Sequence, residues 1–378
     1  MQARIALLTE IISPYRIPVF NEIDRSAPGK FRFFFLGKTE KRRQWKIYRE
    51  KIDFYYKVLP SILFQQGSYG SPYFLNPTIF YELMRHSPGI IITGGYQHPS
   101  YLLAMFYAHI FKKRIILWCE SNKYDYRYRH PLKEAYKRWF VRNCAGYIVP
   151  GRASFEYLLS LGAREEKIFT APNAVDNDYF IQSCGRYRQT RATFKQSKGY
   201  PGKLILYVGR LIEQKGVSDL LKAFQMISGK HPEWGLLLVG SGEREKEYRG
   251  YCRTNDMRNV FFTGFIHQEE LPAYYAISDC LVLPTHSDPW GLVLNEAMSA
   301  QLPVISSDVA GAAYDLIQPG KNGYIFNKGN VHQLSGYISD ILSDERKRAV
   351  MGQKSFDIIK NYSPVECARG FIRAVREV

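Results

Sequence analysis

Short apolar runs alternate with helical patterns along almost the whole chain. Between the runs, segments such as 132–143 and 217–228 repeat apolar residues every three or four positions, as helices with one buried face do. Short, nearly all-apolar strands separated by helices predict parallel sheets covered on both faces, and therefore an α/β fold with doubly wound sheets. The strands predicted in this way are residues 4–9, 31–36, 90–93, 114–118, 146–149, 204–208, 235–239, 260–263, 280–283 and 303–306.

One stretch interrupts this alternation and predicts a domain boundary. Residues 183–202 are polar, basic and contain several glycines, and a new apolar strand follows them. We therefore expect an N-terminal domain at 1–182, a linker at 183–202 and a C-terminal domain at 203–363, each long enough for its own core. Pro364 ends the helical pattern before it, and we expect the last segment, 364–378, to cross back onto the first domain.

Two acids beside a glycine turn carry the most specific chemical signal. Asp288 and Glu296 lie between two apolar runs, and a helix is expected to begin directly after Gly291. A strand, a turn and a helix N-terminus in this order form an anion site, because unpaired backbone N–H groups face the ligand there. Carboxylates suit sugar hydroxyls rather than phosphates. The combination predicts a nucleotide-sugar pocket.

A second strand-to-helix loop contains the cations such a pocket needs. Gly209 follows the strand at 204–208 and permits a tight turn, and Arg210 and Lys215 come next. Arginine can bind phosphate oxygens with two donors and lysine adds a point charge, so the pattern predicts a diphosphate clamp. The alternative interpretation is an ordinary loop with two solvated cations.

Two further glycine turns follow strands of the second half. Residues 239–242 resemble a dinucleotide fingerprint but lack its third glycine, so a simple tight turn is the alternative. Gly264 ends the strand at 260–263, at the sheet edge where ligands bind in such folds. Backbone groups of Phe265 and Ile266 are candidates for contacting a planar base, and a plain loop is the other interpretation.

These segments, in this order, resemble glycosyltransferase family 4, which has the GT-B fold of two Rossmann-like domains facing a central cleft. The resemblance covers residues 204–330 closely and the first domain less tightly. The segments that carry it are Val208-Gly209-Arg210-Leu211 with Lys215-Gly216, Val239-Gly240-Ser241-Gly242, Phe262-Thr263-Gly264-Phe265, Asp288-x7-Glu296-Ala297-Met298, Leu302-Pro303-Val304-Ile305, Ser13-Pro14-Tyr15-Arg16 and Pro172-Asn173-Ala174-Val175-Asp176.

The resemblance implies a retaining sugar transfer from a nucleotide diphosphate donor, without a metal and with no cofactor besides that co-substrate. Arg210 and Lys215 would hold the diphosphate and stabilise the leaving group as charge develops. Glu296 would bind the ribose hydroxyls, and Asp288 would face hydroxyls of the donor sugar. The groups expected to cap the sugar or phosphate at the helix start are the backbone amides of Trp290, Gly291 and Leu292.

The chain departs from the family pattern in two places. The first acid is usually Glu, whereas Asp288 is one methylene shorter, which would shift the donor sugar or select another. Where many members carry a His after a strand of the first domain, this chain has Cys119-Glu120. We favour Glu120 as the acceptor-side polar group or base, because a buried thiol offers little to a sugar hydroxyl, and Cys119 is the alternative.

Two more residues of the first half are candidates because they follow strands. His98 is predicted to line the acceptor side, and a structural role in the loop is the alternative. Arg16 follows the first strand and is a candidate for contacting donor phosphate or an anionic acceptor.

Charge is distributed unevenly along the chain. The formal net charge is +17, and residues 1–180 contain about 27 Lys and Arg against about 15 Asp and Glu. The segments 38–51 and 132–143 interleave cations with aromatic residues, which favours docking on an anionic membrane where a lipid-linked acceptor would be found. The alternative for both is a solvated face whose aromatic residues lie in the core.

Other features narrow the class of protein. The six cysteines form no CxxC pair, which argues against zinc and for a reducing compartment. The first ten residues lack a signal-peptide pattern, and the apolar stretch at 101–111 is too short to span a bilayer. We therefore expect a cytoplasmic enzyme, peripheral on the inner face of the plasma membrane where it docks.

Rival functions remain at this stage. A nucleotide-sugar epimerase of the same fold is the enzymatic alternative, although the Asp288 and Glu296 arrangement favours transfer. A nucleic-acid-binding protein would explain the charge, but it leaves the paired acids unused and no nucleic-acid-binding motif is present. We expect a UDP-sugar rather than GDP-mannose as the donor, and a polysaccharide, lipopolysaccharide or lipid-linked acceptor.

Overall fold

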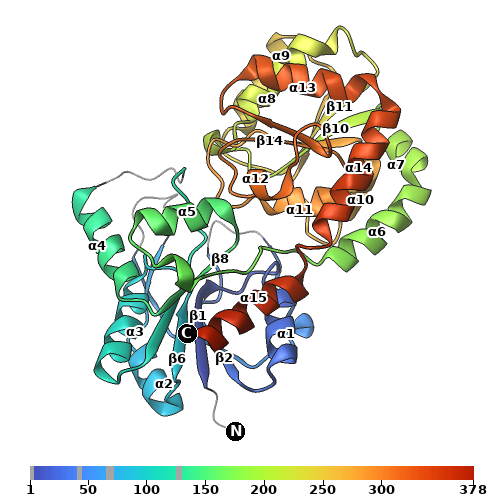
Figure 1. The fold of residues 1–378 in the computed structure, drawn as a ribbon. Helices are drawn as coiled ribbons and strands as arrows, with labels where there is room; N and C mark the ends of the chain where they lie inside the picture. Colours follow the sequence, from blue (N-terminus) through green and yellow to red (C-terminus); the bar gives the residue numbers. More distant parts are fainter. Residues whose placement is uncertain (1–3, 41–44, 65–71, 125–129) are drawn as a thin grey trace. The chain divides into compact units, whose positions relative to one another are not determined.

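The computed structural model describes residues 4–40, 45–64, 72–124 and 130–378. Its chain divides into two compact units (Figure 1). The first unit comprises the described residues within 1–123, 127–175 and 364–378, and the second those within 124–126 and 176–363. Each unit is an α/β structure with its own parallel sheet.

The first unit contains a seven-stranded parallel sheet with the order β3-β2-β1-β6-β7-β8-β9. Both faces are buried: along β1, Ala6 and Leu8 belong to one hydrophobic cluster while Ile5 and Leu7 belong to another. A separate antiparallel pair, β4 and β5, lies in the same unit. The strands are β1 Ile5–Ile11, β2 Phe31–Gly37, β3 Tyr56–Val58, β4 Ile62–Phe64, β5 Tyr73–Leu75, β6 Ile90–Thr93, β7 Arg114–Trp118, β8 Gly146–Val149 and β9 Ile168–Thr170.

Helices cover both faces of this sheet. The C-terminal helix α15 packs on α1, β8 and β9, because its apolar stripe includes Cys367, Phe371 and Ala374. The stripe meets the sheet through Phe371, whose ring centroid lies 5.1 Å from that of Trp118. The helices are α1 Ile17–Ser26, α2 Ile79–His86, α3 Pro99–Ile110, α4 Pro131–Arg142, α5 Arg152–Ser160 and α15 Pro364–Glu377, with 3-10 turns η1 Arg49–Lys51 and η2 Glu165–Lys167.

The second unit contains a six-stranded parallel sheet with the order β12-β11-β10-β13-β14-β15. The strands are β10 Lys203–Val208, β11 Trp234–Val239, β12 Val260–Gly264, β13 Cys280–Leu283, β14 Val304–Ser307 and β15 Gly323–Phe326. The helices are α6 Asn177–Gln189, α7 Arg191–Ser197, α8 Val217–Ser228, α9 Glu245–Thr254, α10 Leu271–Ile277, α11 Leu292–Ser299, α12 Ala313–Leu316, α13 Val331–Ser343 and α14 Glu345–Ile359, with the 3-10 turn η3 Glu213–Lys215.

The stretch at 183–202, expected as a linker, is mostly helical and belongs to the second unit. Helices α6 and α7 occupy most of it, and both contact α10. Ion pairs also anchor it: Arg191 Nη2 lies 2.5 Å from Asp279 Oδ1, and Lys195 Nζ lies 3.6 Å from Asp279 Oδ2. Two of its cations therefore pair with the acid that precedes β13.

The strand orders define where each sheet can bind a ligand. In the first unit β1 is flanked by β2 and β6, and in the second β10 is flanked by β11 and β13. At such a reversal of strand order the neighbouring helices leave on opposite faces, so the loops at the carboxyl ends of the strands open a crevice. Arg16 follows β1, and Arg210 follows β10. Each unit thus has a candidate cation after its central strand.

Candidate functional site

Two loops of the second unit are joined at the carboxyl end of its sheet. The loop after β10 contains Gln214, whose carbonyl oxygen accepts hydrogen bonds from His286 N at 2.8 Å and Thr285 Oγ1 at 3.0 Å. Both of these residues belong to the loop after β13. Because β10 and β13 are neighbouring strands, the loops that contain Lys215 and Asp288 meet at the same edge.

Close backbone approach explains two of the glycines in these loops. Gly216 has a φ of 64°, and a Cβ atom there would lie 2.0 Å from the carbonyl oxygen of Pro284. Gly240 would bring a Cβ within 1.9 Å of the carbonyl oxygen of Gly209. Any side chain would push these loops apart, so the glycine-rich pattern is needed for the packing of the site itself.

Lys215 and Asp288 form an ion pair. The distance from Lys215 Nζ to Asp288 Oδ2 is 2.5 Å, and both side chains are largely buried. The other carboxylate oxygen of Asp288 accepts a hydrogen bond from the backbone N–H of Trp290 at 3.3 Å. The expected clamp lysine and the expected sugar-facing acid are therefore in direct contact, and one of the amides expected to cap the ligand is bonded to that acid.

Arg210 has an exposed side chain on a fixed backbone. Its carbonyl oxygen accepts a hydrogen bond from the Tyr207 hydroxyl at 2.8 Å, and burial raises the pKa of Tyr207, which keeps that hydroxyl protonated as the donor. At the end of β12, the Phe265 side chain is exposed and Ile266 is half-buried. Arg210 and Phe265 therefore both present accessible groups at the carboxyl edge of one sheet, after β10 and β12, which β11 separates.

Glu296 lies deeper than its expected role implies. The residue is 0% exposed on α11, and its Oε2 accepts a hydrogen bond from the Tyr275 hydroxyl at 2.5 Å. The ring of Trp290 is also buried, and its Nε1 donates to Asn295 Oδ1 at 2.9 Å. Gly291, with a φ of 97°, is the N-cap of α11, the helix that contains Asn295 and Glu296. Contact between Glu296 and a ribose therefore requires these surrounding groups to shift on binding.

A histidine pair in the second unit was missed by sequence reasoning. His286 Nε2 lies 2.6 Å from Asp219 Oδ2, at the first turn of α8. The pair links the β13 loop to the helix that follows Lys215. No sequence signal identifies it, because Asp219 reads as one polar residue of an amphipathic helix.

In the first unit, two separately predicted residues form one cluster. Arg16 and Glu120 are paired through Nη2 and Oε1, and Arg16 Nη1 donates to Asn173 Oδ1 at 2.8 Å. The guanidinium also lies 4.5 Å from the ring centroid of Trp118. Cys119, the alternative to Glu120, is buried, whereas the Glu120 side chain is about a third exposed. Accessibility therefore favours Glu120 as the polar group that can meet a substrate.

His98 lies in the hydrophobic core rather than at an accessible surface. Its Nδ1 accepts a hydrogen bond from the backbone N–H of Phe74 at 3.2 Å, and its Nε2 lies 3.0 Å from Glu10 Oε1. Since Nδ1 is an acceptor, a neutral ring carries its proton on Nε2, the nitrogen nearer to Glu10. The ring packs against Phe74 and Tyr101. These contacts fit the structural alternative for His98 better than a place beside an acceptor.

Among the described residues, no group of three or more His, Cys, Asp and Glu side chains is arranged to hold a metal ion. In the same part of the chain, no helix is long and apolar enough to cross a membrane. The six cysteines of the described chain are all buried thiols.

Comparison with protein families assigns the second unit. Residues 189–357 match the family model described as glycosyl transferases group 1. The sulfoquinovosyl transferase SQD2 of Arabidopsis thaliana is 28% identical over 305 residues, which cover 76% of this chain and 56% of the plant protein. The spore coat protein SA of Bacillus subtilis is 33% identical over 178 residues, covering 44% and 47%. The chain spans about half the length of the curated relatives it matches.

Solved structures resemble the whole chain in fold. HepE of Anabaena, solved in complex with UDP and glucose, has a TM-score of 0.74 at 17% identity and covers 100% of both chains. The sucrose-phosphate synthase of Thermosynechococcus elongatus has a TM-score of 0.74 at 19% identity, covering 99% of this chain and 98% of that one. At such identities the likeness concerns the fold alone, and the two parallel α/β sheets match it.

Proposed function

We propose that this chain, which belongs to the group 1 glycosyl transferases (glycosyltransferase family 4) and has the GT-B fold, transfers a sugar from a UDP-sugar donor with retention of the anomeric configuration. The acceptor class that we propose is a polysaccharide, lipopolysaccharide or lipid-linked glycan. The second unit binds the donor and the first unit binds the acceptor.

The ion pair between Lys215 and Asp288 carries this proposal. It lies at the carboxyl edge of the sheet, after two neighbouring strands, within the segment that matches the family model. Arg210, accessible after β10, adds a second cation to the same edge. Two cations and an acid on rigid loops suit a donor that combines a diphosphate with sugar hydroxyls.

The proposed reaction uses these groups to stabilise the leaving diphosphate. The bond between the sugar C1 and the diphosphate oxygen breaks while the acceptor oxygen bonds to C1 on the same face. The acceptor proton passes to the leaving phosphate oxygen. Arg210 and Lys215 neutralise the charge that develops there, which lowers the barrier without a metal ion. Glu120 orients the acceptor hydroxyl, and Arg16 holds Glu120 in place.

The remaining groups of the second unit position the donor. In this proposal the backbone groups of Phe265 and Ile266 contact the base, and Gly209 allows the turn that presents the cations. The amides of Gly291 and Leu292 face the sugar or phosphate. UDP is the proposed nucleotide because HepE, similar over its full length, is solved with UDP and with UDP-glucose.

Nucleotide binding tests the donor half of the proposal. We expect saturable binding of UDP, measured by isothermal titration calorimetry, with weaker binding of GDP. Arg210→Ala should weaken UDP binding by about tenfold to a hundredfold, because a charged hydrogen bond contributes about 1.5–3 kcal/mol. Lys222→Ala, which changes an exposed lysine on α8, is the matched control and should bind UDP normally. Equal UDP binding by the wild type and Arg210→Ala would reject the assignment.

Product analysis tests the reaction itself. With a UDP-sugar panel and a lipid-linked or oligosaccharide acceptor, we expect a product whose anomeric proton coupling in NMR matches that of the donor. Transfer should persist in the presence of EDTA, since the cations replace a metal in this scheme. An inverted product, or loss of transfer with EDTA and recovery with Mg²⁺, would contradict the mechanism.

A further inference from the structure

Large apolar side chains are exposed along one stripe of helix α3. Phe106 is 49% exposed and Ile110 is 63% exposed, and their spacing of four residues places them on one side of the helix. Phe111 follows directly and is also exposed. Exposed aromatic and aliphatic residues that gather in this way mark an interaction surface more often than isolated ones do.

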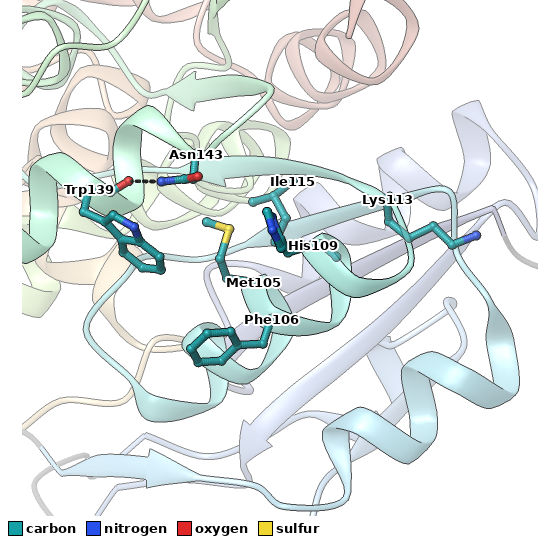
Figure 2. A pocket seen from close by; sticks show the side chains of 8 residues that line it. Met105, Phe106, His109, Lys113, Ile115, Trp139 and Asn143 are labelled. Atoms are coloured by element: carbon teal, nitrogen blue, oxygen red, sulfur yellow. Dashed lines mark hydrogen bonds between the residues drawn. The ribbon is translucent and has the colours of Figure 1, made fainter.

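Helix α4 continues this surface beside α3. Trp139 is 42% exposed and Leu132 is 75% exposed, and both lie on one stripe of α4. Figure 2 shows a pocket between the two helices, of about 300 Å³, with the Trp139 indole and the Phe106 ring on its walls. The residues that line it are Met105, Phe106, Ala108, His109, Lys113, Ile115, Trp139 and Asn143. We call this surface of α3 and α4 the α3–α4 face.

Lysines and arginines lie on and beside the two helices of the α3–α4 face. They are Lys112, Lys113, Arg114, Lys133, Lys137, Arg138 and Arg142. Helix α3 contains no acid, and the single acid of α4, Glu134, lies 2.6 Å from Lys137 Nζ. The α3–α4 face thus combines exposed apolar side chains with cations, and the carboxylate of Glu134 is already paired. Such a face is complementary to a membrane surface, where anionic head groups cover acyl chains.

The other basic segment considered from the sequence has a different character. Tyr48 is buried, and Trp45 and Ile47 pack against the core clusters of the first unit. Residues 41–44 lie outside the described residues. Within 45–51, the aromatic side chains therefore fit the alternative in which they belong to the core.

We propose that the α3–α4 face docks this protein on an anionic phospholipid bilayer. Phe106, Ile110 and Trp139 enter the boundary between head groups and acyl chains, and the pocket between the helices receives an acyl chain. The lysines and arginines beside these side chains add electrostatic attraction to anionic lipid. The proposal goes beyond sugar transfer, since vesicle binding needs neither donor nor acceptor, and the two ideas can fail separately.

Vesicle cosedimentation of the whole chain tests this docking. We expect binding to vesicles that contain phosphatidylglycerol, weak binding to pure phosphatidylcholine, and release by added salt. Phe106→Glu/Ile110→Glu should reduce binding to the anionic vesicles by about tenfold or more, because two apolar insertions are lost and two like charges are added. Lys133→Glu/Arg138→Glu, on either side of the α4 stripe, should reduce it without altering apolar contact.

A matched control variant separates the face from general surface charge. Met226→Glu/Val350→Glu changes residues of the second unit with exposures of 46% and 68%, close to those of Phe106 and Ile110, and introduces the same charge. This control should keep anionic vesicle binding. The far-UV circular dichroism spectrum and the melting temperature of every variant report whether it is folded. An equal loss of anionic vesicle binding in Phe106→Glu/Ile110→Glu and in Met226→Glu/Val350→Glu would overturn the proposal. Equal binding of the wild type to neutral and anionic vesicles would overturn it as well.

A second copy of the chain is the competing occupant of this face. Sedimentation velocity decides between the two, because the docking proposal expects the wild type and Phe106→Glu/Ile110→Glu to have the same mass in solution. A wild-type dimer that this variant converts to a monomer, with vesicle binding unchanged, would show that the face binds another copy rather than lipid.

Discussion

Lys215 Nζ lies 2.5 Å from Asp288 Oδ2, so the residue expected to bind phosphate is held by the residue expected to bind sugar. A diphosphate that approaches Lys215 must therefore compete with this carboxylate. The pair keeps the lysine oriented at the carboxyl edge of the sheet while lowering the positive potential there. The competition between Asp288 and the diphosphate for Lys215 therefore decides how tightly the donor is held.

Removing the charge of Asp288 should strengthen nucleotide binding. In Asp288→Asn, the amide oxygen can still accept from the Trp290 N–H, whereas the repulsion of phosphate and the pairing with Lys215 are lost. We expect UDP to bind about threefold to tenfold more tightly by calorimetry, and transfer to slow because the sugar is no longer oriented. Lys215→Met should weaken UDP binding by at least about tenfold. Weaker UDP binding by Asp288→Asn would contradict the idea that Asp288 competes with the diphosphate for Lys215.

Restoring the usual acid of the family addresses donor choice. Asp288→Glu moves the carboxylate outward by about one methylene, and the Lys215 pair can re-form. If the shorter side chain sets the sugar preference, the ratio of kcat/KM between two UDP-sugars should change while the UDP affinity stays close to that of the wild type. An unchanged ratio across the donor panel would show that specificity lies elsewhere.

Substitutions of Glu120 and Cys119 distinguish which of the two residues contacts the acceptor. The Glu120 side chain is partly exposed and paired with Arg16, whereas Cys119 is buried. Glu120→Gln should lower kcat by about a hundredfold, because the acceptor hydroxyl loses the carboxylate that orients it, and leave UDP binding intact. Cys119→Ala should transfer sugar at a rate close to that of the wild type. The reverse pattern would assign the acceptor-side position to Cys119.

His98 should behave as a stabilising residue. Its ring is enclosed, accepts from the Phe74 N–H and faces Glu10. His98→Ala leaves a cavity and an unpaired backbone donor, and we expect a loss of about 2–4 kcal/mol in the free energy of unfolding. His109→Ala, at an exposed position of α3, is the control. A normal melting temperature combined with a lost kcat for His98→Ala would restore the acceptor-side interpretation.

The regular strands are the part of the fold that the sequence predicts best. The runs at 90–93, 114–118, 146–149 and 280–283 coincide with β6, β7, β8 and β13. Both faces of such strands are buried, so almost every residue is apolar and the signal is strong. The pattern missed β3, β4, β5, β9 and β15, because each has only three or four residues and lies at a sheet edge or in the separate pair.

Side-chain pairing in the candidate site could not be predicted from the sequence. Lys215 and Asp288 are 73 positions apart, and Arg16 and Glu120 are 104 apart. Each pair depends on which strands become neighbours, and on loop conformations that glycines such as Gly216 permit. The sequence predicts cations and acids for the second unit's loops, but it treats as independent ligands residues that the fold brings into contact.

The bond between Tyr275 and Glu296 should matter for stability and for nucleotide binding in separable ways. Tyr275→Phe removes the donor to a fully buried carboxylate, so we expect a loss of about 1–3 kcal/mol of stability. Glu296→Gln can still accept from the Tyr275 hydroxyl and should be milder in stability. If a ribose reaches Glu296 after a local shift, Glu296→Gln should weaken UDP binding while Tyr275→Phe does not. Unaltered UDP binding in both variants would exclude the ribose contact.

Lys195 gives the stretch 183–202 a measurable dependence on pH. Burial lowers the pKa of Lys195 from 10.5 to about 8, partly offset by Asp279. Between these two values the unfolded chain keeps a proton that the folded protein has released, so the unfolded state binds more protons and stability rises with pH. Below about pH 8 both states are protonated and this gain is absent.

The comparison with Lys195→Met isolates this effect from other titrating groups. The melting temperature of the wild type, minus that of Lys195→Met, should increase by several degrees between about pH 8 and about pH 10. Lys198→Met, at an exposed position just after α7, should show no such trend relative to the wild type. A difference for Lys195→Met that is constant across this range, or that falls as pH rises, would mean that Lys195 keeps its proton in the folded protein and that its pairing with Asp279 outweighs burial.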